Sequence, residues 1–146
     1  MEFEDFAVGD RFTSPPVRFT ETDIVAFARQ FDPQPFHLDA DAGKASIYGG
    51  LIASGWHVLC RMFRETVDLG LYDGGGQGAP GLDDVRWRIP VRPDDELTIS
   101  VIIDDKRTSA THANRGYVFM RFEIANQHEE RVASYRVREI FRVRGS

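Results

Sequence analysis

The sequence contains a single cysteine, Cys60, which excludes an intramolecular disulfide and a zinc site built from thiolates. It also has no apolar run near the ~20 residues that a membrane-spanning helix needs. Residues 1–5 are acidic and do not show the basic and then apolar layout of a signal peptide. We therefore expect a cytoplasmic protein that has no association with a membrane.

The sequence has no basic stripe of the kind that binds nucleic acid, and its net charge is −5. Hydrophobic residues make up 42% of the chain and charged residues 28%, as in soluble globular proteins. A chain of 146 residues buries roughly 68–70% of its unfolded surface, which allows one core without disulfides or metal. We therefore expect residues 1–146 to form a single domain that does not bind nucleic acid.

Two helices are expected in the first half of the chain. Thr20 can cap the first, with Asp23 completing a capping box, and its apolar stripe consists of Ile24, Phe27, Ala28 and Phe31. Pro33 and Pro35 end this helix and are expected to keep the next segment extended. A longer helix is predicted to begin within residues 51–55 and to end at Gly70. It is expected to lie against a sheet, because its apolar face is broad: Val58, Leu59, Met62, Phe63, Thr66, Val67 and Leu69.

The second half of the sequence changes to a period of two, which is typical of strands with one buried face. Apolar residues alternate with polar ones in four segments separated by turn-forming stretches: residues 85–89, 97–103, 118–124 and 133–143. With a short opening strand within residues 6–17, this pattern predicts a curved antiparallel sheet of about five strands, the last four forming a meander. A sheet wrapped around a long central helix is an α+β arrangement, and it is the layout of the hotdog fold.

Residues 32–55 contain the densest group of polar and chemically active side chains. Asp32 and His37 stand five residues apart, across two prolines that restrict the backbone. Histidine exchanges protons near neutral pH, so a carboxylate and an imidazole held together form a candidate acid–base pair around one water. The alternative is a buried hydrogen bond between the two that only ties down a loop.

Gly55 is the second candidate, because it falls at the start of the longer helix. A glycine there allows a ligand to approach the backbone closely. The free N–H groups of the first turn, together with the helix dipole, can hold a developing negative charge. The alternative is that Gly55 only makes room for packing between the helix and the sheet.

Residues 32–39 read Asp-Pro-Gln-Pro-Phe-His-Leu-Asp and resemble a motif of the MaoC-like dehydratases and (R)-specific enoyl-CoA hydratases, Asp-x-Asn-Pro-aliphatic-His-x-Asp. Residues 50–56 resemble the Ile-x-His-Gly-Met segment of that family, at the expected distance downstream. Residues 87–95 resemble its Pro-Val-x-x-Gly-Asp turn, and residues 126–129 resemble its Asn-Gln-x-Gly hairpin. The resemblance covers nearly the whole chain.

The resemblance implies that Asp32, His37 and Gly55 are catalytic: the pair activates water, and the Gly55 N–H polarises a thioester carbonyl. The implied reaction is hydration of a trans-2-enoyl-CoA thioester, or the reverse dehydration of an (R)-3-hydroxyacyl-CoA. Coenzyme A is then part of the substrate, and no metal or other cofactor is required. The resemblance also implies a homodimer or a dimer of dimers.

Four residues depart from the family pattern and are expected to bind the substrate: Gln34, Phe36, Ser54 and Trp56. Gln34 replaces Asn, Ser54 replaces His, and the other two are aromatic where the family has aliphatic residues or Met. These changes leave the acyl group open. Two other functions also remain open, a hotdog acyl-CoA thioesterase and a non-catalytic acyl-CoA-binding subunit.

Three further patterns are weaker. Ser54 and His57, three residues apart on a helix, resemble a nucleophile and its base, but no third, orienting acid is evident nearby. His37 with Asp39 and Asp41 offers metal-ligating side chains without a distant partner. Arginines at polar strand positions are expected to face solvent, a second subunit or the phosphates of coenzyme A.

Overall fold

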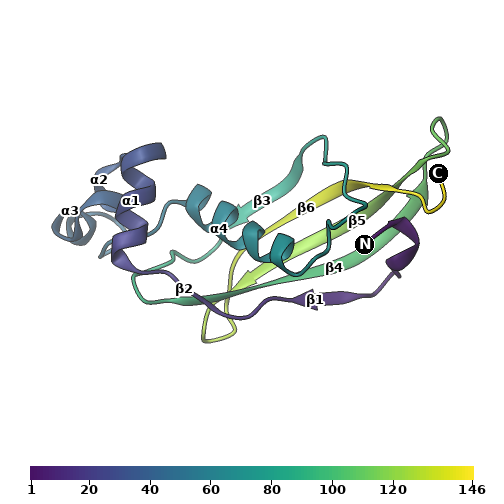
Figure 1. Cartoon of the computed structure of the whole chain (residues 1–146). Helices are drawn as coiled ribbons and strands as arrows, with labels where there is room; N and C mark the ends of the chain where they lie inside the picture. The colour runs from purple at the N-terminus through teal and green to yellow at the C-terminus, as the bar shows by residue number, and fades with distance from the viewer.

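The computed structural model describes all 146 residues, Met1–Ser146, as a curved antiparallel sheet with helices across one face and at one end (Figure 1). Six strands form the sheet: β1 (Arg11–Thr13), β2 (Val17–Arg18), β3 (Leu82–Trp87), β4 (Glu96–Thr108), β5 (Arg115–Ala125) and β6 (Arg131–Arg142). The strand order is β1-β4-β5-β6-β3, and β2 also pairs with β4. The α+β architecture predicted from the sequence is confirmed.

The predicted short opening strand is present as β1, and a further short strand, β2, follows residues 15–16, which are both proline and have no N–H for the ladder. One detail of the predicted sheet is wrong. The last four strands do not form one meander, because β3 pairs with β6, with Trp87 opposite Ala133. Residues 88–95 carry the chain to the other side of β5 and β6 before β4 begins. This crossing leaves β3 as an edge strand.

The long helix α4 (Gly55–Asp68) lies across one face of the sheet, as the sequence predicts (Figure 1). Its buried residues are His57, Val58, Leu59, Met62 and Thr66. Phe63, Val67 and Leu69 are each more than one-third exposed, so the buried face is narrower than predicted. The core beneath the helix comes from the inward-facing residues of β4, β5 and β6. Each large side chain that is fully buried there contributes about 1.5–3 kcal/mol.

Three shorter helices gather at one end of the sheet: α1 (Glu21–Phe31), α2 (Pro35–Leu38) and α3 (Ala40–Ala45). The predicted cap of α1 is confirmed, since the Thr20 hydroxyl accepts a hydrogen bond of 3.1 Å from the Asp23 N–H. The prediction that the next segment stays extended is wrong. Pro35 instead begins α2, because the N–H that proline lacks would have no partner at the first helical position. This turn places His37 on the inward side of a helix, where it is buried.

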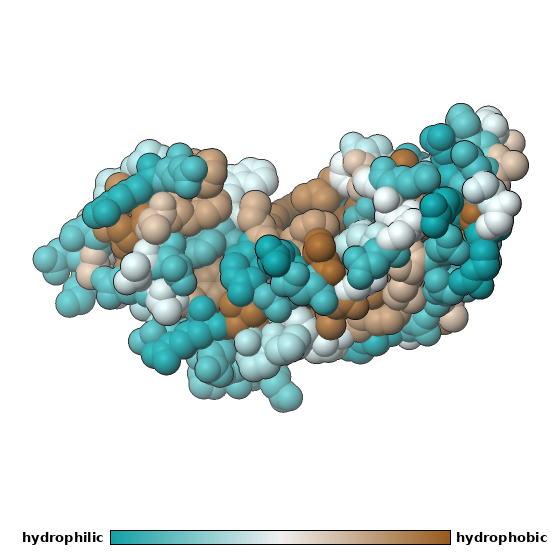
Figure 2. Space-filling model, in the orientation of Figure 1, coloured by the Kyte–Doolittle hydropathy of each residue, from teal (hydrophilic) through white to brown (hydrophobic).

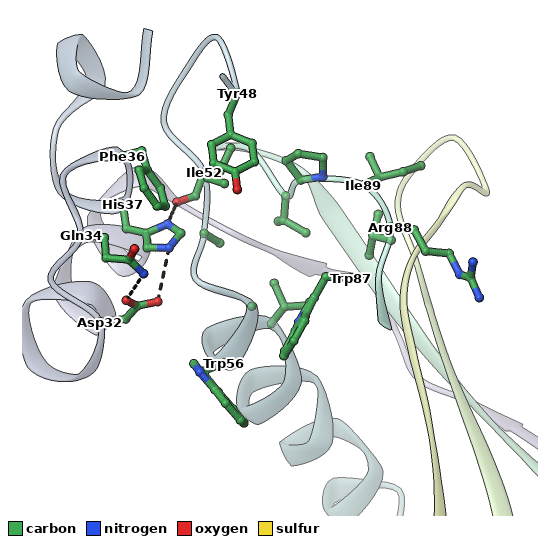
Figure 3. Close-up of a pocket in the computed structure, with 16 residues that line it drawn as sticks. Asp32, Gln34, Phe36, His37, Tyr48, Ile52, Trp56, Trp87, Arg88 and Ile89 are labelled. Carbon is green, nitrogen blue, oxygen red and sulfur yellow. Dashed lines mark hydrogen bonds and ion pairs between the residues drawn. The ribbon is translucent and has the colours of Figure 1, made fainter. Parts of the chain in front are cut away.

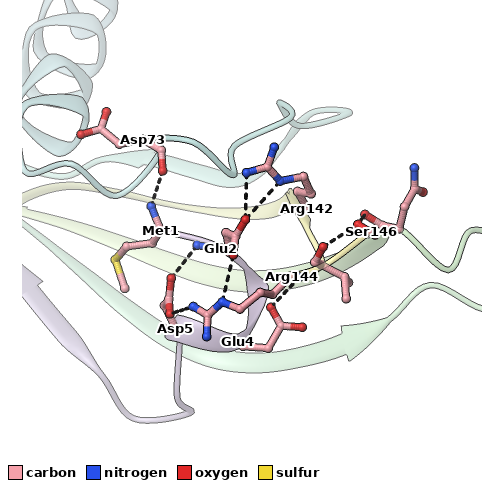
Figure 4. A network of polar contacts seen from close by, with 10 residues as sticks. Met1, Glu2, Glu4, Asp5, Asp73, Arg142, Arg144 and Ser146 are labelled. Carbon is pink, nitrogen blue, oxygen red and sulfur yellow. Dashed lines mark hydrogen bonds and ion pairs between the residues drawn. The ribbon is translucent and has the colours of Figure 1, made fainter.

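The N-terminal 3-10 helix η1 (Phe3–Asp5) is fastened to the end of β6 by ion pairs (Figure 4). Glu2 binds both Arg142, at 2.8 Å, and Arg144, at 3.0 Å. Arg144 also pairs with Asp5. The arginines are about half exposed, so each pair contributes little to stability on its own. The network lies at the opposite end of the sheet from α1, α2 and α3.

Gly43 allows the loop between α3 and α4 to pack closely against α3. Gly43 of α3 is buried, and a Cβ on it would lie 2.5 Å from the carbonyl carbon of Gly50 and from the Leu51 nitrogen. These are backbone atoms, which cannot move aside as the end of a flexible side chain can. Glycine is therefore required here by the close approach of two backbone segments.

We expect Gly43→Ala to destabilise the protein by about 1–3 kcal/mol, because the added methyl overpacks this contact. Helix propensity alone would favour alanine over glycine by about 0.8–1.0 kcal/mol. Gly81→Ala is the matched control, since nothing lies within 4 Å of its Cβ position. Urea denaturation of both variants measures the difference. A Gly43→Ala protein as stable as wild type would show that the two segments separate easily.

Candidate active site

A cavity of about 420 Å³ opens where the helical end of the molecule meets the sheet. Ten of the 16 residues that line it are hydrophobic. Figure 2 shows apolar surface in the depression between these two parts of the molecule. The walls come from the end of α1, from α2, from the first turn of α4, and from the end of β3 with the segment that follows it.

Asp32 and His37 face each other at the wall of this cavity (Figure 3). His37 Nε2 lies 3.3 Å from Asp32 Oδ2, and His37 is only 4% exposed. The other ring nitrogen, Nδ1, lies 2.7 Å from the Ile52 carbonyl oxygen. Because a carbonyl only accepts hydrogen bonds, Nδ1 carries the hydrogen. In the neutral ring, Nε2 is therefore the basic nitrogen; it pairs directly with Asp32 when protonated, and the neutral ring needs a donor such as water to bridge to the carboxylate.

Two neutral donors hold the Asp32 carboxylate. The Gln34 amide nitrogen donates to Oδ1 at 2.7 Å, and the Ser54 hydroxyl donates to Oδ2 at 2.7 Å. Burial raises the pKa of Asp32, but the hydrogen bonds from Gln34 and Ser54 and the charge of a protonated His37 lower it. The lowering effects are larger together, so the pKa of Asp32 lies below its ordinary value. Asp32 is therefore ionised at neutral pH and acts as an acceptor.

Gly55 lies in the cavity wall, at the start of α4, with the Trp87 indole against it. A Cβ at this position would come within 2.5 Å of two indole atoms of Trp87, Cε2 and Nε1. Glycine is thus needed for packing, as the alternative interpretation of the sequence holds. This contact does not occupy the backbone N–H groups of the first turn of α4, which have no acceptor within the helix. The role of the Gly55 N–H stays a prediction.

Three of the four residues expected to bind substrate line the cavity: Gln34, Phe36 and Trp56. Ser54 does not, since it has no exposed surface and its hydroxyl is bonded to Asp32. Sequence reasoning missed other lining residues, including Tyr48, Ile52, Trp87, Arg88, Ile89 and Val91. Trp87 carries a signal that was available, because strand alternation places it on the inward face. The loop residues carry none.

The proposed pairing of Ser54 with His57 is not present. His57 is buried between two rings, 4.9 Å from Phe19 and 4.7 Å from Phe27, and its Nδ1 has no hydrogen-bond partner. Burial lowers the pKa of His57 to about 4. This histidine is a neutral member of the packing between α1 and α4, whereas His37 has defined partners at both nitrogens.

No group of three or more His, Cys, Asp or Glu side chains is arranged to hold a metal ion, so Asp39 and Asp41 do not form a metal centre with His37. Arg88 is the one arginine among the lining residues, and its side chain extends away from the cavity (Figure 3). None of the helices has the length and apolar character that crossing a bilayer requires.

Comparison with known proteins identifies the fold and the family. The chain matches the family described as MaoC like domain over residues 5–118. A MaoC-like dehydratase from Rhodospirillum rubrum is 37% identical, with 100% of this chain and 99% of that chain covered and a TM-score of 0.92. The uncharacterised protein YdeM of Bacillus subtilis is 29% identical over 132 residues, which are 90% of this chain and 92% of YdeM. A double-hotdog protein of Mycobacterium tuberculosis, 14% identical, superposes with a TM-score of 0.84 over 100% of this chain and 45% of its own.

The fold is the hotdog fold, and the family match places the chain among proteins of the hydratase or dehydratase type. The chain belongs to the MaoC-like family, as the resemblance of residues 32–39 and 50–56 predicts.

The burial of His57 leads to a prediction about acid stability. The folded pKa of His57, about 4, lies below the unfolded value near 6.5, so the unfolded chain takes up this proton first as the pH falls. The stability of the protein should therefore decline between pH ~6.5 and pH ~4, by about 3 kcal/mol through this residue. His57→Phe keeps the ring stacking and should remove that part of the decline. Urea denaturation across this pH range measures it.

His128→Gln is the control, because His128 is exposed in the hairpin between β5 and β6. It should leave the pH dependence unchanged. If His57→Phe follows the wild-type curve throughout this range, His57 is not the group that takes up the proton.

Proposed function

We propose that the protein hydrates trans-2-enoyl-CoA thioesters and catalyses the reverse dehydration of (R)-3-hydroxyacyl-CoA. The observation that carries the proposal is the Asp32–His37 pair, with a defined tautomer, at the wall of a largely apolar cavity. An acyl chain fits the apolar walls, and the polar pair lies where the reacting double bond would reach it. The family match supports this class of reaction.

In the proposed hydration step, a water on the cavity side of the pair donates hydrogen bonds to both the Asp32 carboxylate and the basic Nε2 of His37. As the water oxygen bonds to C3, its proton passes to Nε2, and the electrons of the double bond move toward C2 and the thioester oxygen. Asp32 stabilises the imidazolium that forms. Nε2 then returns the proton to C2 of the enolate, on the face that the water attacked. One base acting on one face gives syn addition.

The enolate oxygen needs its own support while the negative charge is present. We assign this role to the Gly55 N–H, at the positive end of α4. For the N–H to be reached, the thioester must pass the Trp87 indole, which lies against Gly55. Phe36, Trp56 and Trp87 form an aromatic boundary for the acyl group near this point. No metal or redox cofactor takes part in these steps.

One observation supports a second candidate, the non-catalytic acyl-CoA-binding subunit. Trp87 covers the side of Gly55 that would otherwise be open to the cavity. A protein that only binds acyl-CoA does not require access to the Gly55 N–H. The two candidates differ in whether any turnover occurs, which a direct assay decides.

Asp32→Asn and His37→Ala should each lower enoyl-CoA hydration about 10²–10⁴-fold, the usual contribution of general acid–base catalysis. Loss of the conjugated-thioester absorbance measures the reaction. Substrate binding should persist and can be followed by tryptophan fluorescence, because both tryptophans of the chain, Trp56 and Trp87, line the cavity. Asp41→Asn is the control, since Asp41 is exposed on α3.

Three results would contradict the proposal. Near-full hydration in either variant would remove Asp32 and His37 from the mechanism. Release of free coenzyme A thiol from saturated acyl-CoA, without hydration, would indicate a thioesterase. A wild-type protein whose fluorescence responds to acyl-CoA but which catalyses neither reaction would be a binding subunit.

We also propose that the protein is a homodimer, or a dimer of dimers, that pairs through β3. This edge strand has no neighbour on its outer side, and unpaired edges tend to be covered in native proteins. Large apolar side chains are exposed along it and beside it: Leu82 at 49%, Trp87 at 47% and Trp56 at 58%. A second sheet added here would cover these residues and the open side of the cavity.

Leu82→Lys should convert the dimer to a monomer, because a lysine on an edge strand opposes strand addition. Light scattering at micromolar concentration measures the change from twice the chain mass to the single-chain mass of 16.6 kDa. Ile47→Lys is the control, since Ile47 is 93% exposed in the loop after α3. A monomeric wild-type protein would rule out the pairing.

A further inference from the structure

Ser54 stands at the N-cap position of α4 but does not cap the helix. A serine at this position usually accepts a hydrogen bond from an N–H of the first helical turn. No such bond is formed here, and the Ser54 hydroxyl donates instead to Asp32 Oδ2, at 2.7 Å. Ser54 has no exposed surface, so water does not compete for this contact. The Ser54 hydroxyl therefore hydrogen-bonds the Asp32 carboxylate and does not cap α4.

The oxygen that Ser54 binds is the one that faces His37. Oδ2 of Asp32 accepts from Ser54 and lies 3.3 Å from His37 Nε2, while Oδ1 accepts from Gln34. The terminal torsion of an aspartate is soft, so its carboxylate turns easily unless both oxygens are held. Gln34 is exposed, and water can take the place of its amide. Ser54 is buried, which makes it the support that water does not replace.

We propose that Ser54 is a positioning residue, which holds the Asp32 carboxylate toward His37 and leaves the first-turn N–H groups of α4 uncapped beside the cavity. The assignment rests on the proposed function for its effect on turnover, but not for its effect on Asp32. A serine with only a structural role would join α1 to α4 without altering how Asp32 ionises.

Ser54 supports Asp32 with a hydroxyl, which stays neutral over the whole pH range in which the protein is folded. Ser54 takes the position at which the motif of the related proteins has histidine. An imidazole gains a charge near neutral pH, whereas a hydroxyl does not. Asp32 in this chain therefore keeps the same neutral donor as the pH changes.

The test compares Ser54→Ala and Ser54→Gly with Ser46→Ala. Ser46 is the control, because its hydroxyl also donates a hydrogen bond, to the Gly43 carbonyl at 2.6 Å, without touching Asp32. Carbon NMR of the Asp32 carboxyl measures its pKa. Loss of a hydrogen bond to a charged group should raise it by about one to two pH units in both Ser54 variants. The acidic limb of the kcat/KM profile should move by the same amount.

Glycine is well tolerated at an N-cap, so Ser54→Gly tests the role even if Ser54→Ala fails to fold. An Asp32 pKa in folded Ser54→Gly equal to that in Ser46→Ala would overturn the proposal, whatever happens to turnover. A raised pKa in a protein whose wild type hydrates no enoyl-CoA would support the role of Ser54 and contradict the proposed function. The two failures are therefore distinguishable.

Discussion

A buried imidazole has two polar ring nitrogens, and each needs a partner once water is excluded. At His37, the Ile52 carbonyl satisfies one of them, and this single hydrogen bond leaves the other to face Asp32. Ile52 belongs to the loop that α3 holds through the backbone contact at Gly43, and Asp32 ends α1. The helices α1, α2 and α3 are thus arranged so that both ring nitrogens of the buried His37 face a polar group.

The same arrangement places a negative charge beside the positive end of a helix. Ser54 is the N-cap residue of α4 and binds Asp32, so the carboxylate lies at the N-terminus of that helix, where the dipole stabilises an anion. In the proposed reaction, the dipole would also support the enolate oxygen near Gly55. The N-terminus of α4 would then stabilise two anions, the Asp32 carboxylate and the enolate. The neutral donors Ser54 and Gln34 hold the Asp32 carboxylate in place.

Much of this fold could be predicted because it depends on local patterns. The long helix, the later strands and the Thr20 cap follow from side chains at fixed spacings. The position of β3 at the edge of the sheet could not be predicted, since it depends on pairing with β6, a strand far away in the sequence. At the site, side-chain chemistry made Asp32 and His37 a candidate pair, and the resemblance of residues 32–39 favoured a catalytic role over a structural one. The contribution of Ile52 could not be predicted, because it comes from a backbone carbonyl group, which every residue has. Alternation identifies Trp87 as a strand residue, but its place in the cavity wall depends on where β3 lies.

Trp87 belongs to two structures at once. It is the last residue of the edge strand β3, and its indole forms the wall against Gly55. Any chain that adds to this edge fixes the backbone of β3 and so fixes the indole as well. If the protein pairs through this edge as proposed, assembly and selectivity are not independent of each other. In the proposed dimer, a change that fits the edge to a new neighbour would also reshape the cavity wall beside Gly55.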